Sequence, residues 1–127
     1  MRKYAWIMAL PLAMVIVGAG AAFAAADRHE LNWTGDPRAP EDATGHVVLN
    51  YAEGSDKTIV QVNVRNHAPG VVHEVYMLTP GRHLVGEFET RRNGSGNLNV
   101  HMDGDHSGHL PIVVAEQDTG VRVVMTD

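Results

Sequence analysis

The sequence has 127 residues, no cysteine and a formal net charge of −5. Without cysteine the chain forms no disulfide, offers no thiol chemistry and cannot build an iron–sulfur or blue-copper site. Its acidic balance repels nucleic acid and anionic lipid headgroups, so we expect neither as a partner.

Residues 1–24 have the composition of a secretory signal peptide. Arg2 and Lys3 give a positive start, an uncharged apolar run covers 5–17, and two A-x-A sites lie within 22–26. This order is typical of a signal that is cleaved during export. The alternative is an uncleaved anchor, because a bilayer is spanned by about 20 apolar residues. We expect cleavage, a secreted or periplasmic protein, and no membrane insertion afterwards.

Removing residues 1–24 leaves 103 residues, which is the size of one small domain. This part keeps eight of the ten Lys and Arg residues and all fifteen Asp and Glu residues, so its net charge is −7. Residues 25–43 are polar, contain Pro37 and Pro40, and show no periodicity. We expect an extended N-terminal segment here, anchored by Trp33, before a β domain that spans 44–127.

Turn-forming clusters of Gly, Pro, Asn, Asp and Ser divide residues 44–127 about every 10–12 residues, a spacing typical of sandwiches and barrels. Between them apolar side chains alternate with polar ones, which predicts strands with one buried face. The predicted inward sets are Val47, Leu49 and Tyr51; Val60, Val62 and Val64; Leu84 and Phe88; Leu98, Val100 and Met102; and Val121, Val123 and Met125. Residues 71–78 and 110–115 are apolar on both faces, which favours central strands.

Seven strands and no helical period predict an all-β fold, an antiparallel seven-stranded immunoglobulin-like sandwich. A small Greek-key barrel is the alternative. Tyr76-Met77-Leu78, the G-x-F-x-T stretch at 86–90 and the glycine-rich turn at 93–98 resemble a pattern in exported prokaryotic immunoglobulin-like β-sandwich domains. The resemblance implies the fold and export, but no particular activity.

Residues 101–109 hold the densest group of possible metal ligands, namely His101, Asp103, Asp105, His106 and His109. Imidazoles spaced H-x-x-H on a glycine-containing loop can close on one ion, and a mixed nitrogen and oxygen set suits Zn²⁺ or Cu²⁺. The alternative is a solvated turn, since Asp, Gly, His and Ser all favour turns. A further ligand on a neighbouring strand would favour the metal site. His46 and His83 lie on predicted outward faces.

Other chemistry finds little support in the sequence. Neither His29-Glu30 nor His73-Glu74 continues as H-E-x-x-H, and His73 is expected to be a hydrogen-bonded core residue. The serines lie in turns, without the context of a nucleophile elbow. We therefore expect a non-enzymatic exported β-sandwich that acts as a binding or structural module, with a protein or cell-envelope partner and no cofactor. The alternative is an extracytoplasmic divalent-metal-binding protein that uses the 101–109 loop.

Overall fold

A computed structural model of the chain describes residues 26–127, and the predicted signal peptide lies outside them. The strands in this part are β1 (Asp27–Trp33), β2 (Thr44–Ala52), β3 (Lys57–Arg65), β4 (Val72–Met77), β5 (His83–Glu89), β6 (Gly96–Asp103), β7 (Ile112–Glu116) and β8 (Arg122–Met125). The described residues form no helix, which confirms the all-β prediction. None of them belongs to a helix long and apolar enough to cross a membrane.

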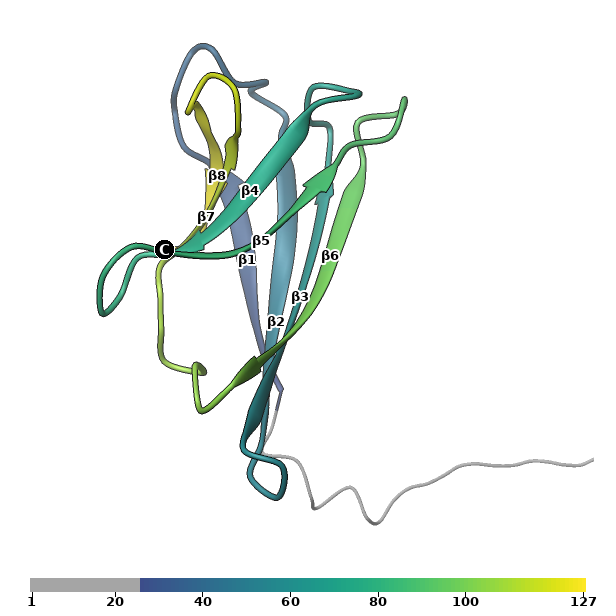
Figure 1. The fold of residues 1–127 in the computed structure, drawn as a ribbon. Helices are drawn as coiled ribbons and strands as arrows, with labels where there is room; N and C mark the ends of the chain where they lie inside the picture. The colour runs from purple at the N-terminus through teal and green to yellow at the C-terminus, as the bar shows by residue number, and fades with distance from the viewer. Residues whose placement is uncertain (1–25) are drawn as a thin grey trace, which may run out of the picture.

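The strands form one antiparallel sheet in the order β5-β4-β7-β8-β1-β2-β3-β6. β5 and β6, the two ends of this order, lie against each other without a hydrogen-bonded ladder. The sheet therefore curls into a nearly closed barrel, with an unpaired seam between β5 and β6 (Figure 1). Eight strands in this order do not support the seven-stranded immunoglobulin-like sandwich, and they lie closer to the barrel alternative.

β1 occupies the segment that was expected to be an extended lead-in. It pairs with β2 through 27–31 and with β8 through 32–33, so it joins the two halves of the sheet. Its alternation is hard to recognise because Leu31 is its one fully buried apolar residue, while His29 and Trp33 are only half-buried. Trp33 packs against the core, and its indole N–H donates to the carbonyl of Asp36 at 3.2 Å.

The barrel core consists mainly of valines from alternate positions of the strands. Val60, Val62 and Val64 of β3 are at most 1% exposed, whereas the residues between them face solvent. β4 and β7 are interior strands of the sheet, as the apolar runs at 71–78 and 110–115 predict. Period-two patterning therefore located most of the core correctly.

Two inward assignments, Met125 and Leu84, are wrong. Met125 lines a surface hollow, and its neighbour Val124 lies in the core instead. Leu84 was placed on the same face as Phe88, but Leu84 is 49% exposed and Phe88 is 9% exposed. The register of β4 and β5 shifts between Val75 and Tyr76, and such a bulge turns the following side chains to the other face. Val85 packs against the core instead.

Candidate metal centre

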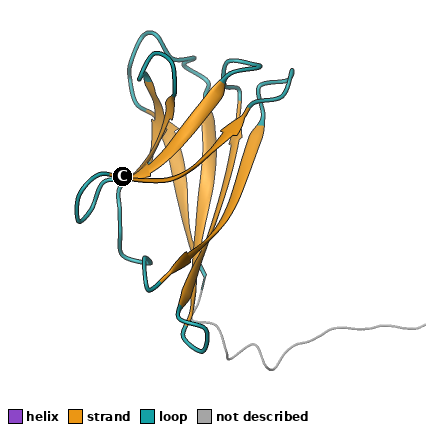
Figure 2. Cartoon of the chain, viewed as in Figure 1, coloured by secondary structure: helices purple, strands orange, loops and turns teal. Residues whose placement is uncertain are grey.

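Three histidines from two loops meet beside the barrel seam. His83 is the first residue of β5, and His106 and His109 lie in the β6–β7 loop. One ring nitrogen from each lies within 4.8 Å of the others, and all three residues are half-buried. Figure 2 shows the β4–β5 and β6–β7 loops on the same side of the barrel. The cluster thus joins segments from the two unpaired edges of the sheet.

Thr58 of β3 fixes the path of the β6–β7 loop. Its side chain is fully buried, its hydroxyl donates to the carbonyl of Gly104 at 2.7 Å, and it accepts the backbone N–H of His106 at 2.8 Å. Gly104 has a φ of +88°, a conformation that glycine adopts at little cost. The amide of His109 donates to the carbonyl of His106 at 3.1 Å, closing a turn that brings the two rings together.

Backbone carbonyls orient two of the three rings. A carbonyl only accepts, so the Nε2 of His106, 2.7 Å from the carbonyl of Asp103, carries the proton. The Nδ1 of His106 then carries the lone pair, and in the absence of metal it accepts a hydrogen bond of 2.9 Å from the Nδ1 of His109. In the same way the Nδ1 of His83 donates to the carbonyl of Gly81 at 3.0 Å. That leaves its Nε2, which is buried and has no hydrogen-bond partner among the described residues.

This pattern is the one that metal-ligating histidines adopt, in which the second ring nitrogen donates to a carbonyl or carboxylate. Zinc–nitrogen bonds of 2.0–2.1 Å in a tetrahedral site place two ligand nitrogens about 3.4 Å apart. The Nδ1 atoms of His106 and His109 are 2.9 Å apart, and the three ligand nitrogens lie within 4.8 Å of one another, so side-chain movements can bring them to that spacing. The three ring planes meet at 54°, 85° and 88°, so the nitrogens approach from different directions. Three ligands leave a fourth position open.

Of the five loop residues suggested by the sequence, the structure brings His106 and His109 into the cluster. His101 is exposed on β6, where it pairs with Ile59. Asp103 forms an ion pair with Lys57, whose hydrogen bond and charge lower the pKa of Asp103.

Asp105 accepts hydrogen bonds from the backbone and hydroxyl of Ser107, which lower the pKa of its carboxyl group. The charges of His106 and His109 lower this pKa further, so the Asp105 carboxylate lies near the cluster without being part of it. His83 lies outside this loop. The sequence indicated it only as an outward-facing histidine beside a turn on another strand, where a further ligand could lie.

Carboxylates make the surroundings of the β2–β3 turn and this loop electronegative. The hydroxyl of Tyr51 donates to Asp56 at 2.7 Å, and this bond raises the pKa of Tyr51 to about 12. The pKa of Tyr51 is raised further by burial and by the negative charges of Asp56, Asp105 and Glu53. An electronegative environment favours a bound cation.

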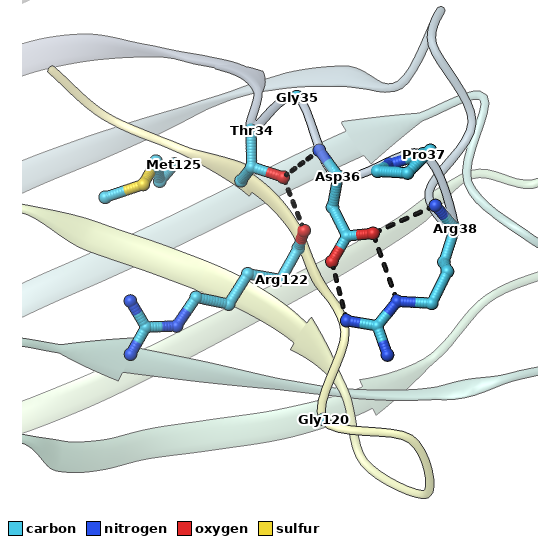
Figure 3. A pocket seen from close by; sticks show the side chains of 8 residues that line it. All are labelled: Thr34, Gly35, Asp36, Pro37, Arg38, Gly120, Arg122 and Met125. Carbon is cyan, nitrogen blue, oxygen red and sulfur yellow. Dashed lines mark hydrogen bonds and ion pairs between the residues drawn. The ribbon is translucent and has the colours of Figure 1, made fainter.

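A surface hollow elsewhere on the molecule offers no comparable chemistry. It measures about 770 Å³ and lies between the 34–38 segment and β8 (Figure 3). Its one carboxylate, Asp36, binds Arg38 in a bidentate ion pair, and this hydrogen bonding lowers the pKa of Asp36. The hydroxyl of Thr34 donates to the carbonyl of Arg122 at 2.6 Å. The Asp36 carboxylate and the Thr34 hydroxyl are both satisfied, and no unpaired carboxylate or histidine lines the hollow.

Two further histidines are buried in the core. His67 is 3% exposed and His73 is fully buried, and their ring centroids lie 5.1 Å apart. The Nδ1 of His73 lies 2.9 Å from the carbonyl of Val71, and its ring stacks on Phe88 at 5.5 Å. The structure confirms that His73 is a hydrogen-bonded core residue. Burial lowers the pKa of both histidines.

Comparisons of the chain with protein-family models, with curated proteins and with solved structures find no match. The functional interpretation therefore depends on the geometry of the molecule itself.

Proposed function

We propose that this protein is an extracytoplasmic metal-binding domain that holds one Zn²⁺ or Cu²⁺ ion through His83, His106 and His109. The observation that carries the proposal is the convergence of the three imidazoles, two of which have their protonated nitrogen fixed by a backbone carbonyl. The composition of residues 1–24 supports export to the periplasm or the exterior.

The chemistry of the donors limits the choice of ion. An all-imidazole set suits Zn²⁺ and Cu²⁺, whereas Ca²⁺ and Mg²⁺ require oxygen ligands. His83 and the His106–His109 pair come from different sheet edges, so a bound ion would connect segments that are distant in sequence. The open fourth position would take water or a donor from a partner. Among residues 26–127 no other side chains form a catalytic set around the cluster, so binding or buffering of metal is the role that we assign.

The test is calorimetric titration of the protein, purified without a histidine tag, with Zn²⁺ and with Cu²⁺. We expect one saturable site per chain. Replacing His83 by Ala should weaken it by more than the roughly 10–100-fold that loss of an outer-shell partner causes. The matched control is His101→Ala, which removes an exposed histidine from the predicted loop but not from the cluster.

Equal affinities for His83→Ala and the wild type would contradict the assigned cluster. Equal weak binding by all variants would mean scattered surface histidines. That outcome would favour the other function considered, an exported module that binds or supports an envelope partner without metal.

A further inference from the structure

A second hollow lies on the outer surface of the barrel, about 540 Å³ in volume, where β2, β3 and β6 meet the β5–β6 turn. Arg28, Arg65 and Arg91 all line it, and they come from three separate segments. They are three of the eight Lys and Arg residues in a part of the chain whose net charge is −7. No carboxylate lines this hollow. The charge of the hollow is therefore opposite to that of the domain.

Two of the three guanidinium groups are free of acidic partners. Arg91 is held by neutral groups, because its Nη1 and Nη2 donate to the Ser95 hydroxyl at 3.3 Å and the Asn97 side-chain carbonyl at 3.0 Å. Within the part of the chain that the structure describes, neither Arg65 nor Arg91 forms an ion pair. Arg28 is paired with Glu30 at 3.0 Å. A positioned, unneutralised guanidinium offers a planar pair of donors that fits a carboxylate.

Amide side chains extend from the hollow along the same face. Strand register places His46 of β2, Asn63 of β3 and Asn97 of β6 in one outward row, which begins on β1 with Glu30, the ion-pair partner of Arg28. The next outward row on β3 and β6 carries Gln61 and Asn99, which also face solvent. Each amide both donates and accepts hydrogen bonds, which matches the hydroxyl groups of a sugar.

We propose that this face binds a short acidic oligosaccharide. Arg65 and Arg91 take carboxylates of uronic acid units, and the amides of Asn63, Asn97, Gln61 and Asn99 bond to the hydroxyls between them. No Phe, Tyr or Trp lines the hollow, so affinity comes mainly from charge and hydrogen bonds and falls as salt screens the charges. The ligand is short because the remainder of the domain is acidic and repels a long polyanion. This inference does not depend on the metal site.

The experiment is titration with a short oligouronate in metal-free buffer, at low and at high salt. Probes for comparison are a neutral oligosaccharide of equal length and inorganic phosphate. We expect salt-sensitive binding of the oligouronate, weakened about tenfold or more in the Arg65→Gln/Arg91→Gln variant. The matched controls are Arg92→Gln, the exposed neighbour of Arg91 that does not line the hollow, and Arg65→Gln alone. Arg92→Gln should change the affinity by less than about twofold. The affinity of Arg65→Gln should lie between those of Arg92→Gln and the double variant.

Four results would overturn the proposal. An equal loss in Arg92→Gln would show an effect of overall charge, and equal binding of the neutral sugar would remove the role of the arginines. Phosphate binding as tight as oligouronate binding would mean a simple anion site. Absence of binding by every probe would also overturn it. Because no metal is present, each of these results leaves the proposed metal function untouched.

Discussion

The contact between Phe88 and Gly96 sets how closely β5 approaches β6. A Cβ on Gly96 would lie 2.5 Å from Cε2 of Phe88, so the ring occupies the space that a side chain would need. Gly96→Ala should therefore cost about 1–3 kcal/mol through overpacking. Phe88→Ala should cost about 3–5 kcal/mol through the lost burial and the cavity. Urea titrations of both variants, followed by circular dichroism, measure these losses.

The double variant tests whether these two residues interact directly. Removing the ring opens space for the new methyl group, so Gly96→Ala should cost much less in the Phe88→Ala background. Additive losses would show that the seam does not depend on this contact. The exposed neighbour Glu87 provides a control, since Glu87→Ala should change stability by less than about 0.5 kcal/mol.

The buried pair His67 and His73 should make the domain sensitive to acid. Burial lowers the pKa of His67 from 6.5 to about 4, and the charge of the nearby His73 adds to this effect. As the pH falls below about 6.5, the unfolded chain takes up a proton that the folded chain excludes until about pH 4. The free energy of unfolding should therefore decrease between these values, by up to about 3 kcal/mol from His67. Burial lowers the pKa of His73 also, although its hydrogen bond to the Val71 carbonyl and the charge of Glu116 oppose this.

Urea titrations at pH 7.5 and pH 5 measure the part of this loss that occurs above pH 5. In His67→Leu the loss should be smaller than in the wild type, because the group that excludes the proton is gone. His101→Leu, at an exposed position, should retain the full loss. If His67→Leu and the wild type lose equal stability, the acid sensitivity has another source.

At the scale of strands and loops, the three-histidine cluster lies where the barrel is not closed by hydrogen bonds. A metal ion there would connect the start of β5 to the loop that follows β6. Zn²⁺ at 100 times its Kd should add about 2.7 kcal/mol to stability. Hydrogen exchange should slow in β5 and the β6–β7 loop, and little in β1 or β2. His83→Ala should abolish both the gain in stability and the slower hydrogen exchange. Uniform protection of all strands would argue against a metal ion that connects only β5 and the β6–β7 loop.

Thr58 supports the cluster from outside it, and Thr90 offers a control with the same chemistry. Each hydroxyl is buried, donates to a carbonyl and accepts an amide N–H: Gly104 and His106 for Thr58, and Ala68 and Val71 for Thr90. Valine in place of either should cost about 1–3 kcal/mol, because backbone groups lose their partner. Only Thr58→Val should weaken Zn²⁺ binding, by about tenfold. Equal affinities in the two variants would show that the loop holds its shape without Thr58.

The strands that sequence analysis found share one physical property, a buried face that repeats every second residue. Val60, Val62 and Val64 show this pattern clearly, and the structure buries all three. β1 escaped recognition because its inward positions include a histidine and only one fully buried residue. The position of Leu84 depends on a bulge set by pairing between strands, which one sequence does not reveal. His106 and His109 could be suggested because they are close together in the sequence. His83 is distant from them in the sequence, and only the pairing of strands brings it to the cluster.

For the whole molecule, β1 is the hydrogen-bonded link between the two halves of the sheet. It pairs with β2 on one side and β8 on the other, and Leu31 is fully buried in the core. Removing it would leave one piece of four strands and one of three, each with an exposed apolar face. We therefore expect a chain that begins at residue 44 not to fold, although the predicted domain boundary lay there.

The same architecture predicts that the protein folds without metal. Its core lies among the strands and excludes the three histidines of the cluster, so the metal adds stability to a domain that is already folded. This differs from small zinc domains, in which binding and folding are one event. In metal-free buffer we expect one cooperative urea transition, with the same midpoint by circular dichroism and by Trp33 fluorescence. Trp33 is a sensitive reporter because it sits in β1 at the junction with β8. Leu31→Ala should lower the midpoint through a loss of about 2–5 kcal/mol while keeping the two signals coincident. Separate midpoints for the two signals would show that the halves of the sheet unfold independently, and that β1 does not couple them.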